Sequence, residues 1–285
     1  MVKLPLNLSK SLKAFKDASV GATQPASVVL AGDPALVEAA KERFAEGGMR
    51  PASLADTSAA SLAAVVSAPD ELLVVLTTPD KEAGVEASLG YSLARGSVIV
   101  AVDEGPGVKA RASYLANGAS RLAFSSASPG GWSRLFSLCA EAAGDRGVAL
   151  ARRYPVVRQA AARRLVWKTA AQNVFIALVF FVPGSDMPAM TLNQARMVLN
   201  LAAMYGQQID KERAVEIAGV VVLGYGFRGI GRLLVRSVPG LSLVMRVVTA
   251  YSATMAVGLG AMAYFEKGAP ASTSKVVALA GSLRR

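Results

Sequence analysis

Nineteen consecutive residues near the end of the chain, from Val247 to Phe265, contain no charged residue and no Pro, Asn or Gln. As an α-helix this run would be about 28 Å long, close to the thickness of a hydrocarbon core. Ala253, Ala256 and Gly260 follow at three- and four-residue steps, so that a second helix backbone could approach closely. The run therefore predicts a packed, membrane-embedded helix. The alternative is the core helix of a soluble all-helical domain, which its few hydroxyl side chains permit.

Charge and hydropathy divide the 285-residue chain into two halves. Residues 1–150 contain 14 basic and 15 acidic residues, whereas residues 151–285 contain 17 and 5. The hydrophobic content is 53% and the mean hydropathy is +0.39, with the apolar excess mainly after residue 165. A half that is both basic and apolar favours an anionic membrane surface over nucleic acid, because few aromatic side chains adjoin the arginines. We expect a lipid bilayer and a protein partner or second copy as partners, and no nucleic acid.

The chain has no His and one Cys, Cys139. His-based acid–base catalysis, Ser–His and Cys–His nucleophile pairs and His-containing metal sites are therefore excluded. Cys139 lies in an apolar run and is expected to be a small core residue. We expect no catalytic residue, no bound metal and no cofactor. No disulfide can form within the chain, which fits a cytoplasmic location for the N-terminal half.

Short β-rich runs alternate with helical stretches between about Ala26 and Ala143. The β-rich runs are SVVLAG, ELLVVL, SVIVAVD and RLAF, and helices are expected in PALVEAAKERFAEGG, YSLAR, ARASYLANG and GGWSRLFSLCAEAAG. This alternation predicts an α/β domain with a largely parallel sheet. Polar residues at the strand ends are candidates for ligand binding, although each is also an ordinary strand-end or capping residue. They are Asp33, Thr77, Thr78, Asp103, Glu104, Ser125 and Ser126.

The C-terminal half predicts an all-α membrane domain. Ala151–Lys168 carries six basic residues and no acid, Trp167 is placed as an interfacial anchor, and the apolar run Ala170–Val182 follows. After a turn, a helix is expected over Met190–Tyr205, with its start at the capping-box spacing of Thr191 and Gln194 and its end at Gly206. The residues expected to face the membrane are Val247, Val248, Met255, Val257, Leu259, Phe265, Phe175, Leu178, Phe180 and Phe181.

A basic stripe, Arg228, Arg232 and Arg236, lies between the two apolar runs. It is either a solvated helix face or a lipid or partner contact. If the first apolar run crossed the membrane once, this stripe would lie outside, against the positive-inside bias. One solution is that Ala170–Tyr205 forms a hairpin that enters and leaves from the cytoplasmic side. The other is that the stripe faces a partner.

Three glycines, Gly224, Gly226 and Gly229, match the GxGxxG pattern of a dinucleotide-binding turn. Their context does not fit that pattern, because no acidic residue lies about twenty positions on to hold a ribose, and the next apolar run is too long for a strand. Packing between helices explains these glycines better.

The N-terminal order of elements resembles that of a small GTPase domain. The phosphate loop of that family, GxxxxGK[ST], is lost here, because Val37, Glu38 and Ala39 follow Gly32 at the positions of Gly, Lys and Ser/Thr. The guanine-reading NKxD is also missing, and only Ser126 and Ala127 match the short SA motif. The resemblance implies a degenerate GTPase-like domain that does not bind nucleotide in the usual way.

The second half is similar to the YcjF-type, GTPase-associated membrane domain, the domain of unknown function numbered 697. The features that carry the resemblance are a P-x-x-D turn after the first apolar run, a Q-x-x-M helix ending MYG, a VPG turn and a T-x-x-x-G run ending YFEKG. They cover roughly residues 152–268. The family is often found beside or fused to a GTPase and is predicted to be membrane-embedded, and no catalytic residues are established for it.

These observations give an expected organisation and function. We expect an N-terminal arm over 1–24, a GTPase-like domain without a phosphate loop over 25–148, a helical membrane domain over 149–268 and a polar tail over 269–285. The leading hypothesis is a non-enzymatic scaffold or assembly partner at the cytoplasmic (inner) membrane, with its N-terminal domain on the cytoplasmic side. The alternatives are a nucleotide- or NAD-binding enzyme and an accessory subunit of a channel or transporter.

Overall fold

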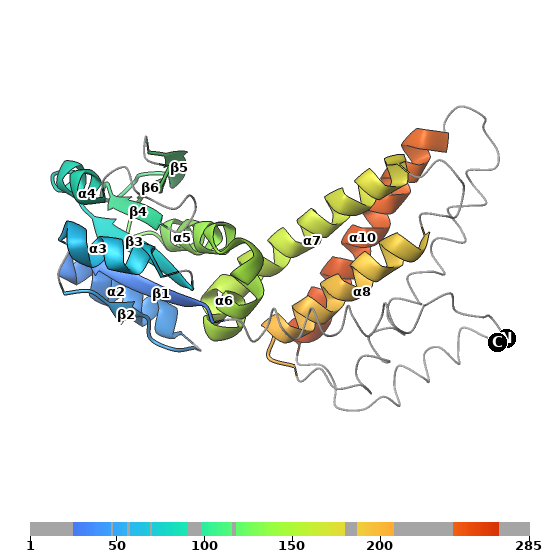
Figure 1. Cartoon of the computed structure of the whole chain (residues 1–285), viewed down its shortest axis with the longest axis horizontal. Coiled ribbons are helices and arrows are strands. Elements are labelled where there is room, and N and C mark those ends of the chain that lie inside the picture. Colours follow the sequence, from blue (N-terminus) through green and yellow to red (C-terminus); the bar gives the residue numbers. More distant parts are fainter. Residues whose placement is uncertain are drawn as a thin grey trace. The chain divides into compact units, whose positions relative to one another are not determined.

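The computed structural model describes residues 25–267 apart from 47, 56–57, 69, 90–97, 116–117, 180–186 and 208–241. The chain divides into two compact units, and the boundary falls inside one long helix, between residues 164 and 165. The first unit is a sheet with helices and the second is a group of long helices (Figure 1). We refer to them as the α/β unit and the helical unit.

The α/β unit contains a six-stranded mixed sheet in the order β2-β1-β3-β4-β6-β5. Neighbouring strands are parallel except for β5 and β6, which are antiparallel. The parallel strands alone follow the flavodoxin-like order 2-1-3-4-5 of doubly wound sheets. The strands are β1 (Ser27–Gly32), β2 (Ala52–Ser53), β3 (Glu71–Thr77), β4 (Val98–Asp103), β5 (Arg111–Tyr114) and β6 (Ser120–Phe124).

The helices of this unit connect and cover the strands. They are α2 (Pro34–Ala45), α3 (Ala59–Val66), α4 (Glu82–Leu89), α5 (Pro129–Ala142), the short 3₁₀ helix η1 (Gly144–Arg146) and α6 (Gly147–Arg153). The four predicted strands and the helices α2 and α5 are confirmed. The predicted YSLAR helix falls mainly on residues 90–97, which lie outside the described residues.

The prediction of a helix in ARASYLANG is wrong, because Arg111–Tyr114 forms the edge strand β5. Four residues between two turns are too few for a stable helix, and pairing with β6 satisfies their backbone groups instead. The short strand β2 and the helix α3 were not predicted. β2 has only two residues, and α3 is a small-residue segment without a strong apolar stripe.

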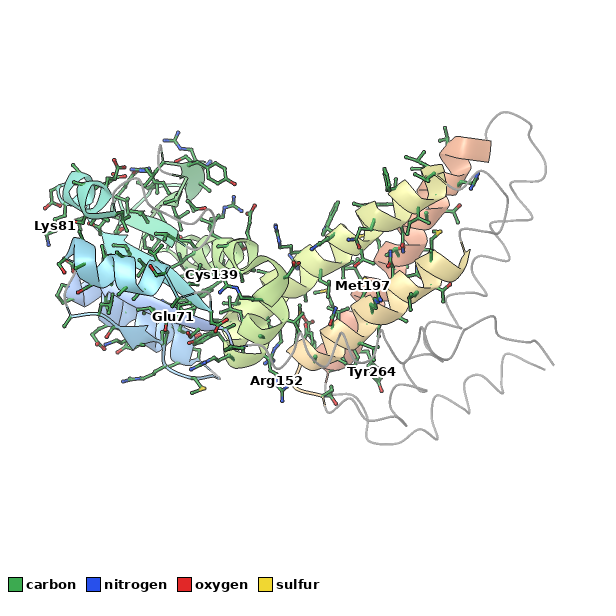
Figure 2. All side chains as sticks on the ribbon, in the orientation of Figure 1. Glu71, Lys81, Cys139, Arg152, Met197 and Tyr264 are labelled. Atoms are coloured by element: carbon green, nitrogen blue, oxygen red, sulfur yellow. The ribbon has the colours of Figure 1, made fainter. Side chains whose placement is uncertain are left out.

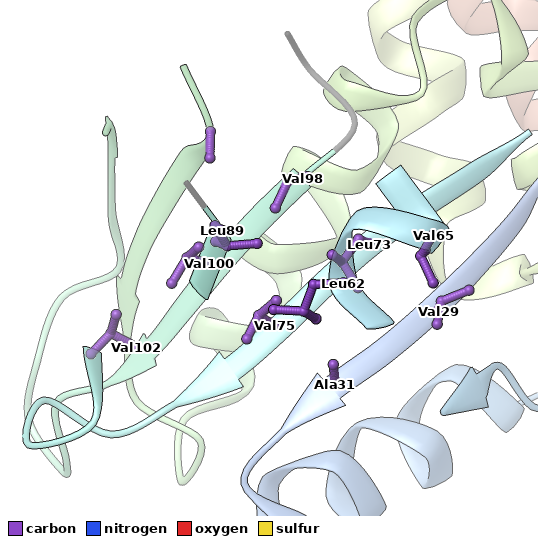
Figure 3. Packing of buried hydrophobic residues seen from close by; sticks show 11 residues of the cluster. Val29, Ala31, Leu62, Val65, Leu73, Val75, Leu89, Val98, Val100 and Val102 are labelled. Carbon is purple, nitrogen blue, oxygen red and sulfur yellow. The ribbon is translucent and has the colours of Figure 1, made fainter. Parts of the chain in front are cut away.

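The core lies on both faces of the sheet. On one face, alternate residues of β3 and β4 pack beneath Leu62 and Val65 of α3 (Figure 3). Elsewhere in the core Phe44 of α2 makes edge-to-face contacts with Phe136 and Tyr154, with ring centroids 5.1 and 5.6 Å away. Burial on both faces explains why the parallel strands are nearly continuous apolar runs.

The helical unit contains α8 (Met187–Met204), α10 (Ser242–Glu266) and the second half of α7 (Pro155–Val179). α8 and α10 run in the same direction, since Met190 packs near Ala250 and the ring of Tyr205 lies 6.0 Å from that of Phe265. α7 runs in the opposite direction: Ala177 packs in the same cluster as Ala250, and Val166 lies against Gly258. The three helices lie side by side (Figure 1).

Two predicted helix ends have different outcomes. α8 ends at Met204, and Gly206 adopts φ +72° just beyond it, as predicted. The predicted start is wrong: α8 begins at Met187, so Thr191 and Gln194 lie inside the helix and are buried. Met190, in the first turn, is buried in the same apolar cluster as Ala177 and Ala250.

Several predictions fall on residues outside the described part of the chain. They concern the N-terminal arm, Phe180, Phe181, the glycines Gly224, Gly226 and Gly229, the basic stripe Arg228, Arg232 and Arg236, and the polar tail.

Candidate functional site

The carboxyl end of β1 is the first place to look for a ligand site, because doubly wound sheets bind ligands at strand ends. Only Asp33 separates β1 from α2. Its Oδ1 accepts a hydrogen bond from Ala35 N at 3.1 Å, and its Oδ2 pairs with Lys81 Nζ at 2.9 Å. The hydrogen bond from Lys81 is the main cause that lowers the pKa of Asp33. The N-terminus of α2, where an anion could bind, is therefore occupied by the chain's own carboxylate.

Gly32 makes this tight connection possible. It adopts φ +113°, and a Cβ atom there would lie 1.9 Å from the carbonyl oxygen of Leu76. The backbone N–H of Asp33 donates to that same oxygen at 2.8 Å. The residue after β1 is thus held against β3 without room for a longer loop.

The end of β4 is tied to the loop after β6. Asp103 Oδ1 accepts from Ser126 N and from Gly105 N, both at 3.1 Å, and Ser126 Oγ donates to Asp103 Oδ2. The indole N–H of Trp132 donates to the Ser126 carbonyl at 2.8 Å. Asp103 and Ser126 therefore fasten two loops to each other.

The remaining strand-end candidates are also engaged or buried. Arg121 on β6 pairs with Glu82 and with Glu104, the latter at 3.2 Å, and these carboxylates raise the pKa of Arg121. Thr77 is buried and donates to the Thr78 carbonyl at 3.4 Å. The hydroxyl of Ser125 is buried without a hydrogen-bond partner among the described residues.

The charged strand-end residues are thus already engaged, Asp33 with Lys81, Glu104 with Arg121 and Asp103 with Ser126. Among the described residues, no group of three or more Cys, Asp or Glu side chains could hold a metal ion. Cys139 is fully buried, and burial raises the pKa of its thiol to about 12. Lys81 and Cys139 are far apart within the α/β unit (Figure 2).

The helical unit carries a buried polar cluster that joins its three helices. Asn173 Nδ2 of α7 and Gln194 Nε2 of α8 donate to Thr254 Oγ1 of α10 at 2.9 and 3.0 Å. Thr254 donates in turn to the Ala250 carbonyl at 2.7 Å, and Asn193 Nδ2 donates to Asn173 Oδ1 at 3.2 Å. The hydroxyl of Thr254 therefore uses its one donor and two acceptor positions.

The sequence interpretation did not find this cluster. The signal was present, because Asn173 interrupts the apolar run Ala170–Val182 and Gln194 interrupts an apolar helix face. A single polar residue in an apolar helix often bonds to a neighbouring helix in a membrane domain.

The surface of the helical unit is apolar. Its exposed large hydrophobic residues are Trp167, Phe175, Leu178, Val179, Val244, Val248, Leu259 and Tyr264. Arg246–Glu266 of α10 is long and apolar enough to cross a membrane, and 28% of its most apolar window is buried. The core helix of a soluble protein would be mostly buried. One such helix is weak support for membrane association.

The residues predicted to face a membrane divide into three groups. Val248, Leu259, Phe175 and Leu178 are exposed, with Phe175 exposed by 68%. Val247, Met255 and Val257 are partly buried. Phe265 is buried and packs beside Tyr205, so it does not face the surroundings.

The predicted helix contact through Gly260 is wrong within the described structure. No described atom lies within 4 Å of a Cβ placed on Gly260, and Ala256 is exposed. Gly258 makes the close contact instead, because a Cβ there would lie 2.5 Å from Val166 Cγ1. The spacing of small residues predicted a close approach but selected the wrong side of the helix.

The C-terminal part of the chain, which contains the described helices α8 and α10 and the second half of α7, also has a match among known families. Residues 143–281 match a domain of unknown function, DUF697. The match begins at residue 143, between α5 and η1, includes the described helices of the helical unit, and leaves the sheet outside. No curated protein and no solved structure matches the chain. The match supports the resemblance to domain of unknown function 697, and the YcjF-type and GTPase-associated character stays a prediction.

Proposed function

We propose that this protein is a membrane-associated, non-enzymatic scaffold or assembly partner. In this proposal the helical unit attaches the chain to a bilayer and the α/β unit presents a surface to a protein partner or to a second copy. The observation that carries the proposal is the exposed, uncharged surface of α10 between Arg246 and Glu266. In water such a surface would be unfavourable by about 25 cal/mol per Å² of apolar area.

The α/β unit supports the non-enzymatic part of the proposal. A phosphate loop needs several backbone N–H groups around an anion, whereas the connection from β1 to α2 is one residue long. The carboxylate of Asp33 already occupies the start of α2, and Asp103 is held by Ser126. A phosphate there would meet a negative charge in place of free N–H groups.

The proposal also includes the expected type of each domain and the expected location of the chain. We propose that the α/β unit is a degenerate GTPase-like domain, that the DUF697 part is of the YcjF type, and that the chain lies on the cytoplasmic face of the inner membrane. The flavodoxin-like strand order gives the GTPase likeness no support of its own. The basic flank of α7 favours the cytoplasmic side through the positive-inside bias.

Membrane fractionation tests the proposed function. The expressed full-length chain is separated with the membranes, which are then washed with high salt and with alkaline carbonate. Retention through both washes is expected, because high salt screens the attraction between charges but does not weaken the burial of apolar surface. Release by high salt alone would contradict the proposal. The basic C-terminal half would then have to be tested for binding to nucleic acid. A thermal shift on adding nucleotides or NAD would contradict the non-enzymatic part.

A further inference from the structure

Contacts along α10 fix the depth of α7 and α8 relative to it. The apolar stretch of α10 runs from Arg246 to Glu266, so its midpoint is Ala256. Val166 of α7 lies against Gly258, and the ring of Trp167 lies 5.9 Å from that of Tyr251. These two contacts lie on either side of the midpoint. The part of α7 around Val166 and Trp167 therefore lies beside the middle of α10.

Charged residues follow at that level. Lys168 is exposed and comes directly after Trp167. Arg196 lies two residues after Gln194, whose side chain bonds to Thr254. If α10 crossed a bilayer with this packing, the Lys168 backbone would lie near the midplane, where a basic residue costs about 3 kcal/mol. The packing therefore disfavours a crossing.

The same residues are well placed for a helical unit that lies along the membrane surface. On α7, Trp167, Phe175 and Leu178 recur at helical spacing on one exposed face. Val244, Val248 and Leu259 form an exposed face on α10, and the contact between Trp167 and Tyr251 joins the two. We call these six exposed residues and Tyr251 the α7–α10 face.

Lys168 lies at one edge of this face. Successive residues of a helix are turned by about 100°, so Lys168 points about 100° away from Trp167 but only about 20° away from Phe175, which is seven residues later. Arg246 is two residues before Val248 and is turned about 160° away from it. Ser252, which is exposed on α10, donates its hydroxyl to the Val248 carbonyl at 2.7 Å, which hides its polar group. An apolar face with charged residues at its edge is typical of helices that lie in the interface between a membrane and water.

We infer that the helical unit lies in the plane of the membrane surface, with the α7–α10 face toward the acyl chains of an anionic bilayer, and that α10 does not cross. This inference rests on the proposed membrane association and specifies its geometry. The charge of the helices fits this partner. Within the helical unit α7 and α8 contribute Lys168 and Arg196 and no acid, and anionic headgroups would lie next to Lys168 and to Arg163, which precedes the unit boundary on the same helix.

The two ends of α10 provide the decisive test. The variant Ser242→Cys/Lys267→Cys is reconstituted as the full chain into sealed anionic vesicles by detergent removal, and floated vesicles are treated with a membrane-impermeant thiol reagent. Cys139 contributes little background because it is buried. Intact mass then counts the labels on each molecule. Both ends lie on one side in the inferred geometry, so each molecule carries either two labels or none. A population with one label would overturn the inference.

Trp167 supplies a second measurement that does not depend on the cysteines. Wild-type chain and Trp167→Phe are compared in vesicles containing lipids brominated near the headgroups or near the chain ends. The difference between the two proteins isolates Trp167, because Trp132 is buried in the α/β unit. Stronger quenching by the shallow bromines is expected. Stronger quenching by the deep bromines, or equal quenching in both proteins, would overturn the inference.

The inference and the proposed function fail in different ways. If the chain does not float with vesicles, the proposed membrane association is wrong. If it floats and carries one label per molecule, membrane association stands and the in-plane geometry is wrong.

Discussion

The two units distribute polar and apolar side chains in opposite ways. Among the described residues, the helical unit holds five of the seven buried polar residues: Thr169, Asn173, Thr191, Gln194 and Thr254. It also holds eight of the ten exposed large hydrophobic residues, whereas the α/β unit exposes only Met49 and Tyr114. Both units thus bury mainly apolar side chains, but the described part of the helical unit also exposes large apolar side chains and buries a polar cluster.

This difference indicates that the α/β unit is suited to water and the helical unit to an apolar environment. The α/β unit satisfies its strand-end polar groups at its edge and buries an apolar core, as folding in water requires. In the helical unit, the cluster around Thr254 supplies contacts that an apolar surrounding cannot supply. The four predictions below test this contrast, from the largest expected effect to the smallest.

Gly32→Val should unfold the α/β unit. The added Cβ would overlap the Leu76 carbonyl, and φ +113° is strained for any β-branched residue. We expect a loss of more than about 3 kcal/mol in the free energy of unfolding, measured by urea denaturation of the full chain.

The control is Gly84→Ala on α4, where a Cβ meets nothing within 4 Å among the described residues. It should change the stability by less than about 1 kcal/mol, in the stabilising direction. Equal stability of Gly32→Val and wild type would show that β1 and α2 are not joined as described.

Arg163→Gln/Lys168→Gln should weaken binding to anionic vesicles. Each basic residue near an anionic surface contributes about 1 kcal/mol, so we expect about a 30-fold loss of partitioning in a sedimentation assay at physiological salt. Neutral vesicles should show a much smaller change.

The matched control removes the same charge from strand β5 and the loop before it, at positions that are not on α7. Lys109→Gln/Arg111→Gln alters two exposed basic residues of the α/β unit and should leave partitioning unchanged. An equal loss in both variants would mean that net charge, and not the position of the basic residues on α7, controls binding.

Asn173→Ala should loosen the helical unit without affecting the α/β unit. It removes the donor to Thr254 and the acceptor for Asn193. A hydrogen bond between membrane helices contributes about 0.6–1.7 kcal/mol, so we expect a loss of about 1 kcal/mol, read from proteolysis of the vesicle-bound chain.

Gln172→Ala, one residue before Asn173 and exposed, is the control and should change stability by less than about 0.5 kcal/mol. If both variants behaved as wild type, the polar cluster would not hold the three helices together.

Asp33→Asn should lower the free energy of unfolding of the α/β unit at neutral pH and leave it unchanged at low pH. The pKa of Asp33 is lowered in the folded state, mainly by Lys81, so its contribution is present above the unfolded pKa and is lost as the pH falls through the folded value. Asn keeps the cap on α2 but does not titrate. We expect a loss of a few tenths of a kcal/mol at pH 7, which vanishes as the pH falls through the lowered pKa of folded Asp33. Thermal melts from pH 2 to 7 would measure it, and a loss that is unchanged at pH 2 would contradict the assigned charge effect.

The sequence predicted the elements whose patterns are local. The β-rich runs gave four strands, and the uncharged run Val247–Phe265 gave α10, because strand composition and helix length can be read from consecutive residues. β5 was missed since its four residues are stabilised by pairing with β6, which lies elsewhere in the chain. A spacing rule cannot show such a distant partner.

The candidate site was harder to predict for the same reason. Sequence named Asp33 and Asp103 correctly as strand-end residues, but their partners Lys81 and Ser126 are 48 and 23 positions away. The bond between Asn173 and Thr254 joins residues 81 positions apart. Helical spacing also identified small residues on α10, yet only tertiary packing shows that, among the described residues, Gly258 and not Gly260 meets a neighbour.

The one-residue connection after β1 also limits how this domain could change. A phosphate loop of the GxxxxGK[ST] type places four residues between its first glycine and the next, whereas Pro34 already begins α2 two positions after Gly32. No single substitution at Asp33, Val37, Glu38 or Ala39 can lengthen that connection. Recovery of nucleotide binding would need an insertion that also releases Gly32 from the Leu76 carbonyl. A library of point variants selected for nucleotide binding should therefore yield no binder at this strand end.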